Sequence, residues 1–177
     1  MQTARLILRA CCPADASDFA ALERDVEVMR YLNGGQPVNR SLAAADSPFL
    51  MPDGTEPYVW AAHRRAGGAF VGWFCLWPQG DKVADLGYRL RRADWGEGLA
   101  SEGALALVAH GFGACGYDRI FAGTMAVNLR SRRVMEKIGM THARTVFPDY
   151  ADPIAGYEAG EVEYDVTRAV WADRGGT

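Results

Sequence analysis

The sequence predicts an α/β (α+β) fold, and three observations lead to it. Strand-like segments and segments of helical periodicity alternate along the 177 residues. A Gly67-Gly68 pair between two apolar runs is typical of a β-hairpin. A later strand runs into a turn nearly free of side chains, Trp95-Gly96-Glu97-Gly98-Leu99-Ala100-Ser101, which opens a helix. No repeat, linker or low-complexity tract divides this pattern, so we expect a single domain over residues 1–177.

The first third of the chain predicts a strand, a helix and a loop. Residues 5–9 form the expected strand, and Pro13 with the acidic residues after it indicates a helix that runs to about Tyr31. Three- and four-residue steps place one set of its apolar side chains on a buried face: Phe19, Leu22, Val26 and Met29. Residues 33–57, rich in Pro, Gly and polar types, predict a loop that lines a cleft, with a short helix at residues 41–45.

The rest of the chain predicts a group of three strands and then alternating helices and strands. The hairpin strands are residues 58–64 and 69–77, and residues 83–90 add the third strand. The helix after the glycine turn is expected to bury one face, formed by Leu105, Val108, Ala109 and Phe112. This helix is predicted at residues 101–112. A second helix is predicted at 128–138, closed by Gly139, and further strands at 117–124, 141–146 and 161–167.

Composition argues against several classes of protein. The chain is 49% hydrophobic and 23% charged, and its formal net charge of −3 gives no general reason to bind nucleic acid or an anionic membrane. Metal-ligand spacing is absent from the four cysteines, Cys11, Cys12, Cys75 and Cys115. Because a chain of this size needs no disulfides, we expect a reducing, cytoplasmic setting and no metal. No apolar run is long enough for a signal peptide or a membrane span.

The glycine turn is suited to receive an anion. The first backbone N–H groups of a helix have no intrahelical partner, and the helix dipole adds partial positive charge. Gly96, Gly98 and Ala100 would let a phosphate approach these groups closely. The Gly-Lys-Ser/Thr ending of a nucleoside-triphosphate loop is missing, and Ser101 stands where a dinucleotide-binding turn has its third glycine. A plain strand-to-helix turn is the remaining alternative.

A second motif follows the next strand: Asn128-Leu129-Arg130-Ser131-Arg132-Arg133-Val134-Met135-Glu136-Lys137-Ile138-Gly139. Together with Gly87-Tyr88-Arg89-Leu90 and the glycine turn, in this order, it resembles the GCN5-related N-acetyltransferase (GNAT) superfamily. Trp95 stands at the start of the turn, where the superfamily generally has Gln or Arg. In this the chain resembles the branch of ribosomal-protein N-terminal acetyltransferase-like enzymes. The resemblance extends from Arg5 to Trp171. It implies a central mixed, mostly antiparallel twisted sheet of about seven strands with helices on both faces, whose two parallel strands splay apart and admit acetyl-coenzyme A (acetyl-CoA).

The resemblance also implies a set of cofactor-binding residues. Backbone groups of the turn would hold the pyrophosphate, and the strand edge before it would pair with the pantetheine arm. Asn128 is similar to the family asparagine that hydrogen-bonds this arm. Arg92 and Arg132 would neutralise phosphates, although solvated surface arginines are an equal alternative. The full set is Gly87, Tyr88, Arg89, Leu90, Arg92, Trp95, Gly96, Glu97, Gly98, Leu99, Ala100, Ser101, Asn128, Ser131 and Arg132.

Two side chains are predicted to do the chemistry. Many members of the family carry a tyrosine four residues before the helix-ending glycine as the acid for the departing thiol, but Met135 stands there. The resemblance therefore points to Ser131 as hydrogen-bond donor or general acid, with helix capping as the alternative role. Asp85, where relatives often carry a glutamate, is the predicted base that takes the amine proton directly or through water. Reserves for this role are Glu56, Glu158 and Glu161.

The predicted function is transfer of an acetyl group from acetyl-CoA directly to a primary amine, either a protein N-terminus or a small molecule. A coenzyme A-binding sensor without turnover is the alternative, because the family tyrosine is missing. No covalent acyl-enzyme is expected, since no motif links a cysteine to a histidine. The sequence leaves open which amine is the acceptor and whether the chain forms a homodimer.

Overall fold

A seven-stranded sheet forms the centre of the fold, with strand order β1-β2-β3-β4-β5-β7-β6. The computed structural model describes residues 1–38, 54–150 and 153–175. Neighbouring strands are antiparallel except β4 and β5, which run parallel, so the expected mixed, mostly antiparallel sheet is confirmed. The strands are β1 (Leu6–Ala10), β2 (Val59–Arg64), β3 (Phe70–Pro78), β4 (Val83–Leu90), β5 (Arg119–Met125), β6 (Thr141–Val146) and β7 (Glu161–Thr167).

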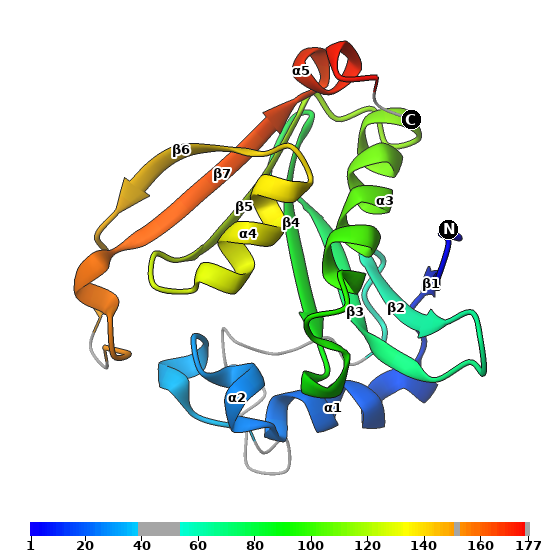
Figure 1. The fold of residues 1–177 in the computed structure, drawn as a ribbon, viewed down its shortest axis with the longest axis horizontal. Helices are drawn as coiled ribbons and strands as arrows, with labels where there is room; N and C mark the ends of the chain where they lie inside the picture. Colours follow the sequence, from blue (N-terminus) through cyan, green and yellow to red (C-terminus); the bar gives the residue numbers. More distant parts are fainter. Residues whose placement is uncertain (39–53, 151–152, 176–177) are drawn as a thin grey trace.

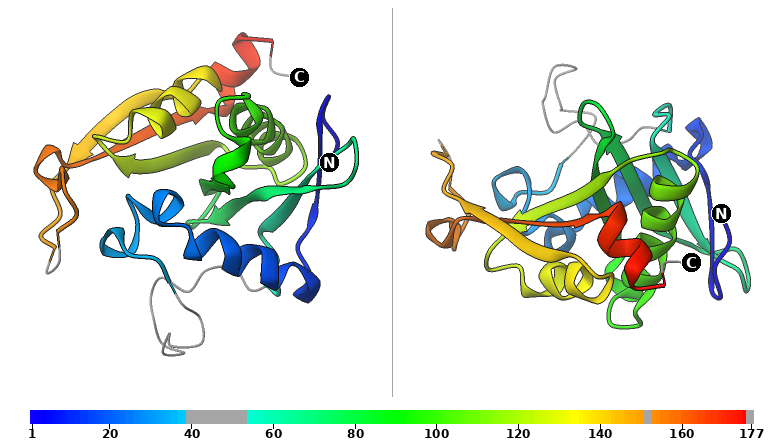
Figure 2. Two further views of the ribbon diagram at one scale, coloured as in Figure 1. Left: turned by 60° about the horizontal axis from the view of Figure 1, so that its bottom comes forward. Right: turned by 90° about the horizontal axis from the view of Figure 1, so that it is seen from above.

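Helices cover both faces of the sheet (Figures 1 and 2). One face carries α1 (Ala16–Arg24) and α2 (Val26–Met29), and the other carries α3 (Leu99–Gly113) and α4 (Leu129–Lys137). A short helix, α5 (Arg168–Asp173), follows β7. Short 3-10 helices occupy Pro13–Asp15, Asn33–Gly35, Arg92–Asp94 and Tyr157–Ala159.

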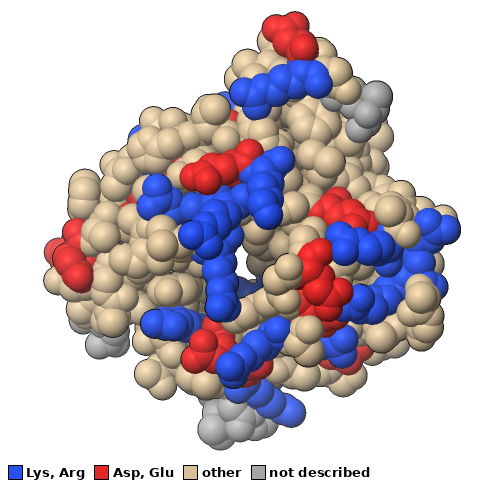
Figure 3. Space-filling model, in the orientation of Figure 1, with Lys and Arg blue, Asp and Glu red and all other residues tan. Residues whose placement is uncertain are grey.

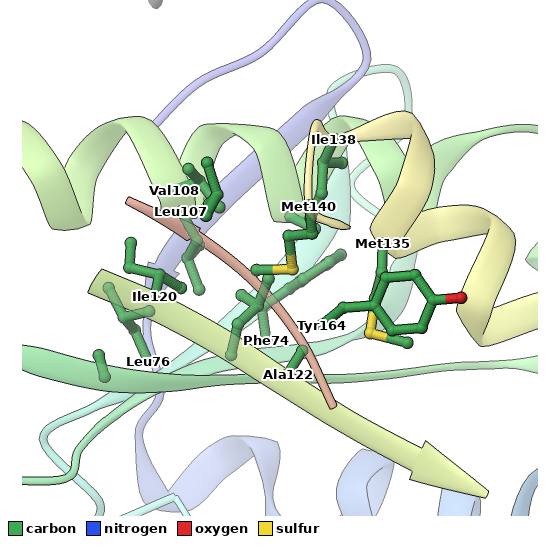
Figure 4. Packing of buried hydrophobic residues seen from close by; sticks show 14 of the residues in the cluster. Phe74, Leu76, Leu107, Val108, Ile120, Ala122, Met135, Ile138, Met140 and Tyr164 are labelled. Carbon is green, nitrogen blue, oxygen red and sulfur yellow. The ribbon is translucent and has the colours of Figure 1, made fainter. Parts of the chain in front are cut away.

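The main core lies between the sheet and the helices α3 and α4 (Figure 4). α3 meets the sheet through small residues: a Cβ on Gly103 would lie 2.3 Å from the Phe74 ring, and one on Gly111 would lie 2.7 Å from Leu76. Val108 and Phe112 are buried as predicted, but Leu105 is 41% exposed. The prediction for Leu105 is wrong because periodicity weighs large apolar side chains, whereas the packed face of α3 contains glycines.

The first helix breaks where the sequence predicted continuity. Asp25 has an extended backbone, and its side chain accepts hydrogen bonds from the N–H groups of Glu27 and Val28, so it ends α1 and caps α2. Val26, the first residue of the new helix, is 56% exposed, and the prediction that it is buried is wrong. The other predicted members of that face are buried: Phe19, Leu22 and Met29.

The remaining predicted elements are confirmed to within about two residues, the usual uncertainty of element boundaries. Gly67 and Gly68, with φ of 81° and 68°, make the predicted hairpin connection. Gly139, with φ of 86°, follows α4 in the expected left-handed conformation. The short helix predicted at residues 41–45 lies outside the described residues.

Two glycines of α3 are predicted to respond oppositely to substitution by alanine. Gly103→Ala lowers the free energy of unfolding by about 1–3 kcal/mol, because the new methyl group overlaps the ring of Phe74. Gly113→Ala is the control: a Cβ there has no atom within 4 Å, and better helix propensity raises stability by up to about 1 kcal/mol. Urea unfolding measures both values. Equal effects at the two positions would contradict the close packing of α3 on the sheet.

Candidate active site

The two parallel strands separate in the middle of the sheet. β4 and β5 pair only from Val83 to Asp85 and from Arg119 to Phe121. Beyond these residues β4 pairs with β3 as far as Leu90, and β5 pairs with β7. An opening between the two strands results, as the resemblance to the GNAT superfamily implies. The glycine turn follows β4 and the start of α4 follows β5, so both motifs lie beyond the opening.

The glycine turn presents backbone donors without partners. Gly96 and Gly98 have φ of 83° and 80°, and no atom lies within 4 Å of a Cβ placed on Gly96. Within the part of the chain that the structure describes, no acceptor is found for the backbone N–H groups of residues 96–101. These groups stand at the N-terminus of a 15-residue helix, α3. The turn therefore has the geometry and the dipole of an anion-binding site.

Two arginines brace this turn, Arg5 just before β1 and Arg64 at the end of β2. Arg5 donates to the carbonyl oxygen of Glu97 at 2.8 Å and to the Glu102 carboxylate at 2.6 Å. Arg64 donates to Asp94 at 2.7 Å and to the Glu97 carboxylate at 2.9 Å. Both glutamates are thus paired away from the free N–H groups. They do not compete with an anion for those groups.

α4 brings positive charge to the same opening. Figure 3 shows Lys and Arg side chains gathered over α4 beside a hollow in this face. The Arg130 guanidinium carbon lies 5.1 Å from the centroid of the Trp95 ring, so α4 contacts the glycine turn by a cation–π interaction. Arg92 is exposed in the 3-10 helix just before the turn. The basic residues of α4 are Arg130, Arg132, Arg133 and Lys137.

Two of the predicted cofactor-binding side chains are engaged inside the fold. Asn128 caps α4, since its Oδ1 accepts from the backbone N–H of Ser131 at 3.3 Å, and its Nδ2 donates to Thr124 at 3.0 Å. Arg132 donates to a backbone carbonyl at 3.0 Å and to the Tyr164 hydroxyl at 3.2 Å. Both residues anchor α4 beside the opening, and their contact with a cofactor stays a prediction.

The Ser131 hydroxyl meets the side chain of Tyr88. Tyr88 Oη lies 2.9 Å from Ser131 Oγ and 3.2 Å from the Ser131 carbonyl oxygen. Because Asn128 caps α4, Ser131 does not have the capping role that the sequence allowed. Burial raises the pKa of Tyr88 to about 12, so its phenol stays protonated near neutral pH. Met135 is fully buried and packs beside Tyr164 in the core (Figure 4).

Asp85 faces the side of the sheet opposite to Tyr88. Alternate β4 residues pack into the core under α3, and Asp85 falls between them, so it points toward the face that carries α1 and α2. Burial, with repulsion from Glu163, raises the pKa of Asp85 to about 6. A carboxyl with this pKa is ionised at neutral pH and still accepts a proton readily. The β4 residues in the core are Ala84, Leu86 and Leu90.

Arg89 lies on the same face as Asp85. Its guanidinium carbon is 5.2 Å from the centroid of the Trp73 ring, and burial lowers its pKa to about 10. The predicted contact of Arg89 with a cofactor therefore rests on its backbone. Gly87, between the two residues, has Cys75 Sγ only 2.7 Å from the position of a Cβ.

Residues 1–38, 54–150 and 153–175 contain no cluster of three or more His, Cys, Asp or Glu side chains that could hold a metal ion. No helix in these ranges has the length and apolar character needed to cross a membrane. His110 packs edge-on against Trp60 with ring centroids 5.7 Å apart, which is a structural contact.

The comparisons with known proteins agree with this geometry. Residues 5–141 match the family model of the acetyltransferase (GNAT) domain. An FsC-acetyl coenzyme A-N(2)-transacetylase from Aspergillus fumigatus is 34% identical over 182 residues, covering 97% of this chain and 77% of the relative. The chain belongs to the GNAT acetyltransferase family. Membership in the GNAT family confirms the expected enzyme class, an acyltransferase.

Solved structures confirm the GNAT fold. A GNAT-family acetyltransferase from Bacillus anthracis superposes with a TM-score of 0.77 at 21% identity, covering 96% of this chain and 98% of its own. A spermidine N-acetyltransferase from Vibrio cholerae, solved with CoA and spermine, gives a TM-score of 0.74 at 14% identity, covering 94% of this chain and 98% of its own. At these identities the likeness concerns the fold.

Sequence reasoning missed four side chains that shape the GNAT site. Arg5 and Arg64 brace the glycine turn, but they precede it by many residues and no motif links them to it. Tyr88 was assigned a backbone role, and its phenol contact with Ser131 depends on the placement of α4. Arg130 stands in the α4 motif, and its contact with the Trp95 ring depends on how α4 packs beside the turn. The alternation of β4 could have signalled that Tyr88 points toward α4.

Asp85 is predicted to titrate near pH 6, because it is buried and faces Glu163. Glu163→Gln removes the repulsion and lowers the pKa of Asp85, as the chemical shift of its carboxyl carbon in NMR would show. Asp118, whose pKa is held below its ordinary value by Arg168, is the internal control and keeps its titration. If Asp85 in the unaltered protein titrated with its ordinary pKa of 3.8, this result would contradict its burial.

Proposed function

We propose that the chain transfers an acetyl group from acetyl-CoA directly to a primary amine. The observation that carries this proposal is the row of unpartnered N–H groups at residues 96–101, beside the opening between β4 and β5. Family membership supports acetyl transfer. The name of the Aspergillus relative, an N(2)-transacetylase, supports a nitrogen acceptor.

The residues present fit the co-substrate. The free N–H groups of the turn would hold the pyrophosphate, and Arg92 and Arg130 would add positive charge around it. The backbone of β4 from Gly87 to Leu90, which has no partner on the side of β5, would pair with the amides of the pantetheine arm. The thioester would then lie in the opening between Asp85 and Ser131.

The two predicted catalytic side chains would act from opposite sides of the sheet. Asp85 accepts the proton that the amine loses, directly or through water. A backbone N–H of β4 near Tyr88 polarises the acetyl carbonyl while negative charge develops on its oxygen. The nitrogen–carbon bond forms, the carbon–sulfur bond breaks with its electron pair on sulfur, and Ser131 donates a hydrogen bond to that sulfur. The sulfur leaves as a thiolate held by this hydrogen bond and takes a proton from solvent, while protonated Asp85 returns its proton to solvent, so the overall step balances.

We also make several finer proposals. The chain forms one domain over residues 1–177. It belongs to the ribosomal-protein N-terminal acetyltransferase-like branch, a proposal that the presence of Trp95 at the start of the glycine turn supports. The four cysteines are free in the structure, which fits a cytoplasmic enzyme.

The acceptor is a protein N-terminus or a small amine, and the enzyme binds neither nucleic acid nor membrane. Sedimentation would test whether the chain forms a homodimer.

The competing function is a CoA-binding sensor without turnover, which the buried Met135 at the position of the family tyrosine favours. Thiol release is measured with acetyl-CoA and a panel of peptides, polyamines, aminoglycosides and amino acids. Release that depends on one class of amine supports the enzyme. Tight CoA binding without release from any acceptor supports the sensor, and no CoA binding overturns both functions.

Arg64→Met is predicted to weaken CoA binding about three- to tenfold, because Glu97 loses its partner and repels the pyrophosphate. Arg65→Met is the matched control. Among the described residues its side chain donates to the carbonyl oxygens of Thr3 and Ala4 and not to the turn, so CoA binding stays unchanged. Calorimetry measures both dissociation constants. Equal constants for the two variants would show that the ion pair with Glu97 does not matter for binding.

Asp85→Asn is predicted to lower kcat/KM about 100-fold or more, since a general base is lost. In the unaltered enzyme the rate, corrected for the protonated amine, rises through about pH 6 as Asp85 ionises. Above pH 6 the Asp85→Asn variant has a higher free energy of unfolding than the unaltered protein. The native pKa of Asp85 exceeds its ordinary value of 3.8, so ionisation destabilises the folded state as the pH rises. Unchanged kcat/KM would remove Asp85 from the chemistry.

A further inference from the structure

The side chain of Tyr88 spans the opening between β4 and β5. It starts on β4, beyond the last residue that pairs with β5, and its hydroxyl reaches the first turn of α4, which follows β5. The Tyr88 ring packs against Phe74, with ring centroids 6.1 Å apart. Phe74 is itself fully buried under Gly103 of α3. The phenol is therefore held in place by the core of the sheet.

The hydrogen bonds of this hydroxyl go to one residue. In the described part of the chain, the partners of Tyr88 Oη are Ser131 Oγ at 2.9 Å and the Ser131 carbonyl at 3.2 Å. A phenol has one proton to donate and accepts as well. When Tyr88 donates to Ser131 Oγ, the hydroxyl proton of Ser131 is directed away from Tyr88. The Ser131 carbonyl can only accept, so if Tyr88 donated to it, Ser131 Oγ would donate to Tyr88 and the serine proton would point back at the phenol. The contact with Ser131 Oγ is the shorter of the two, which favours donation from Tyr88 to Oγ.

We propose that Tyr88 is a positioning residue for acetyl transfer, which orients the Ser131 hydroxyl so that its proton points at the departing sulfur. This inference rests on the proposed function. Burial keeps Tyr88 in its protonated, donating form near neutral pH. No proton has to leave Tyr88 in the reaction. Its hydrogen bond holds Ser131 in the donating orientation while the carbon–sulfur bond breaks and sulfur takes the electron pair.

The test is a double-mutant cycle of Tyr88→Phe and Ser131→Ala, measured as single-turnover acetyl transfer at saturating acetyl-CoA. Tyr88→Phe keeps the ring and removes the hydroxyl. We expect it to lower the rate about five- to tenfold, with the dissociation constant of CoA unchanged within about twofold. In the Ser131→Ala background the same substitution has no further effect. In Ser131→Thr, which retains a hydroxyl, the dependence on Tyr88 returns.

Tyr164→Phe is the matched control for a purely structural effect. Tyr164 also supports α4, by donating to Glu136 at 3.1 Å and accepting from Arg132. Its substitution changes the rate by the same factor whether residue 131 is Ser or Ala. The inference is overturned if Tyr88→Phe transfers acetyl groups at the full rate. It is also overturned if Tyr88→Phe lowers the rate by the same factor with Ser131 and with Ser131→Ala. If the unaltered protein binds CoA but transfers no acetyl group, the proposed function itself fails.

Discussion

The site depends on one constraint, which is that two parallel strands share a sheet but pair over only part of their length. β4 and β5 are hydrogen-bonded near Asp85 and Phe121, and beyond that point each is paired only with its antiparallel neighbour. Backbone groups that lose a partner inside a fold need another one. The opening therefore offers β4 donors and acceptors to an extended ligand, and it places the glycine turn and α4 beyond its two edges.

The electrostatics of the glycine turn show why distant residues matter to it. A turn that is to hold an anion carries Glu97, and the first turn of its helix carries Glu102. Either carboxylate, left unpaired, would repel a phosphate. Arg5 pairs with Glu102 and also donates to the carbonyl oxygen of Glu97, and Arg64 pairs with the Glu97 carboxylate. Arg5, just before β1, and Arg64, in its antiparallel neighbour β2, thus support the proposed anion site through their contacts with the turn.

The sheet separates two kinds of chemistry. On the face of α1 and α2, Asp85 is buried near another carboxylate, an arrangement that costs stability when it is charged and makes it a better proton acceptor. On the face of α3 and α4, hydroxyl groups, free N–H groups and arginines gather, which suit a phosphorylated carrier and a departing thiol. A thioester lying between the strands would be reached from both faces. This separation would let one opening serve the proposed base and the proposed hydrogen-bond donor without contact between them.

By itself, the sequence determined the order of the elements, the glycine turn and the α4 motif, because these are local patterns of periodicity, capping and backbone freedom. It predicted β6 and β7 to the residue. Only the tertiary structure decided that Asp25 ends α1 and that glycines, not Leu105, lie on the packed face of α3. It also decided that Arg5 and Arg64 contact the glycine turn and that Tyr88 contacts Ser131. Their partners lie far away in the chain, or depend on close contact between backbones, so the energy that places them appears only when the sheet and helices are assembled.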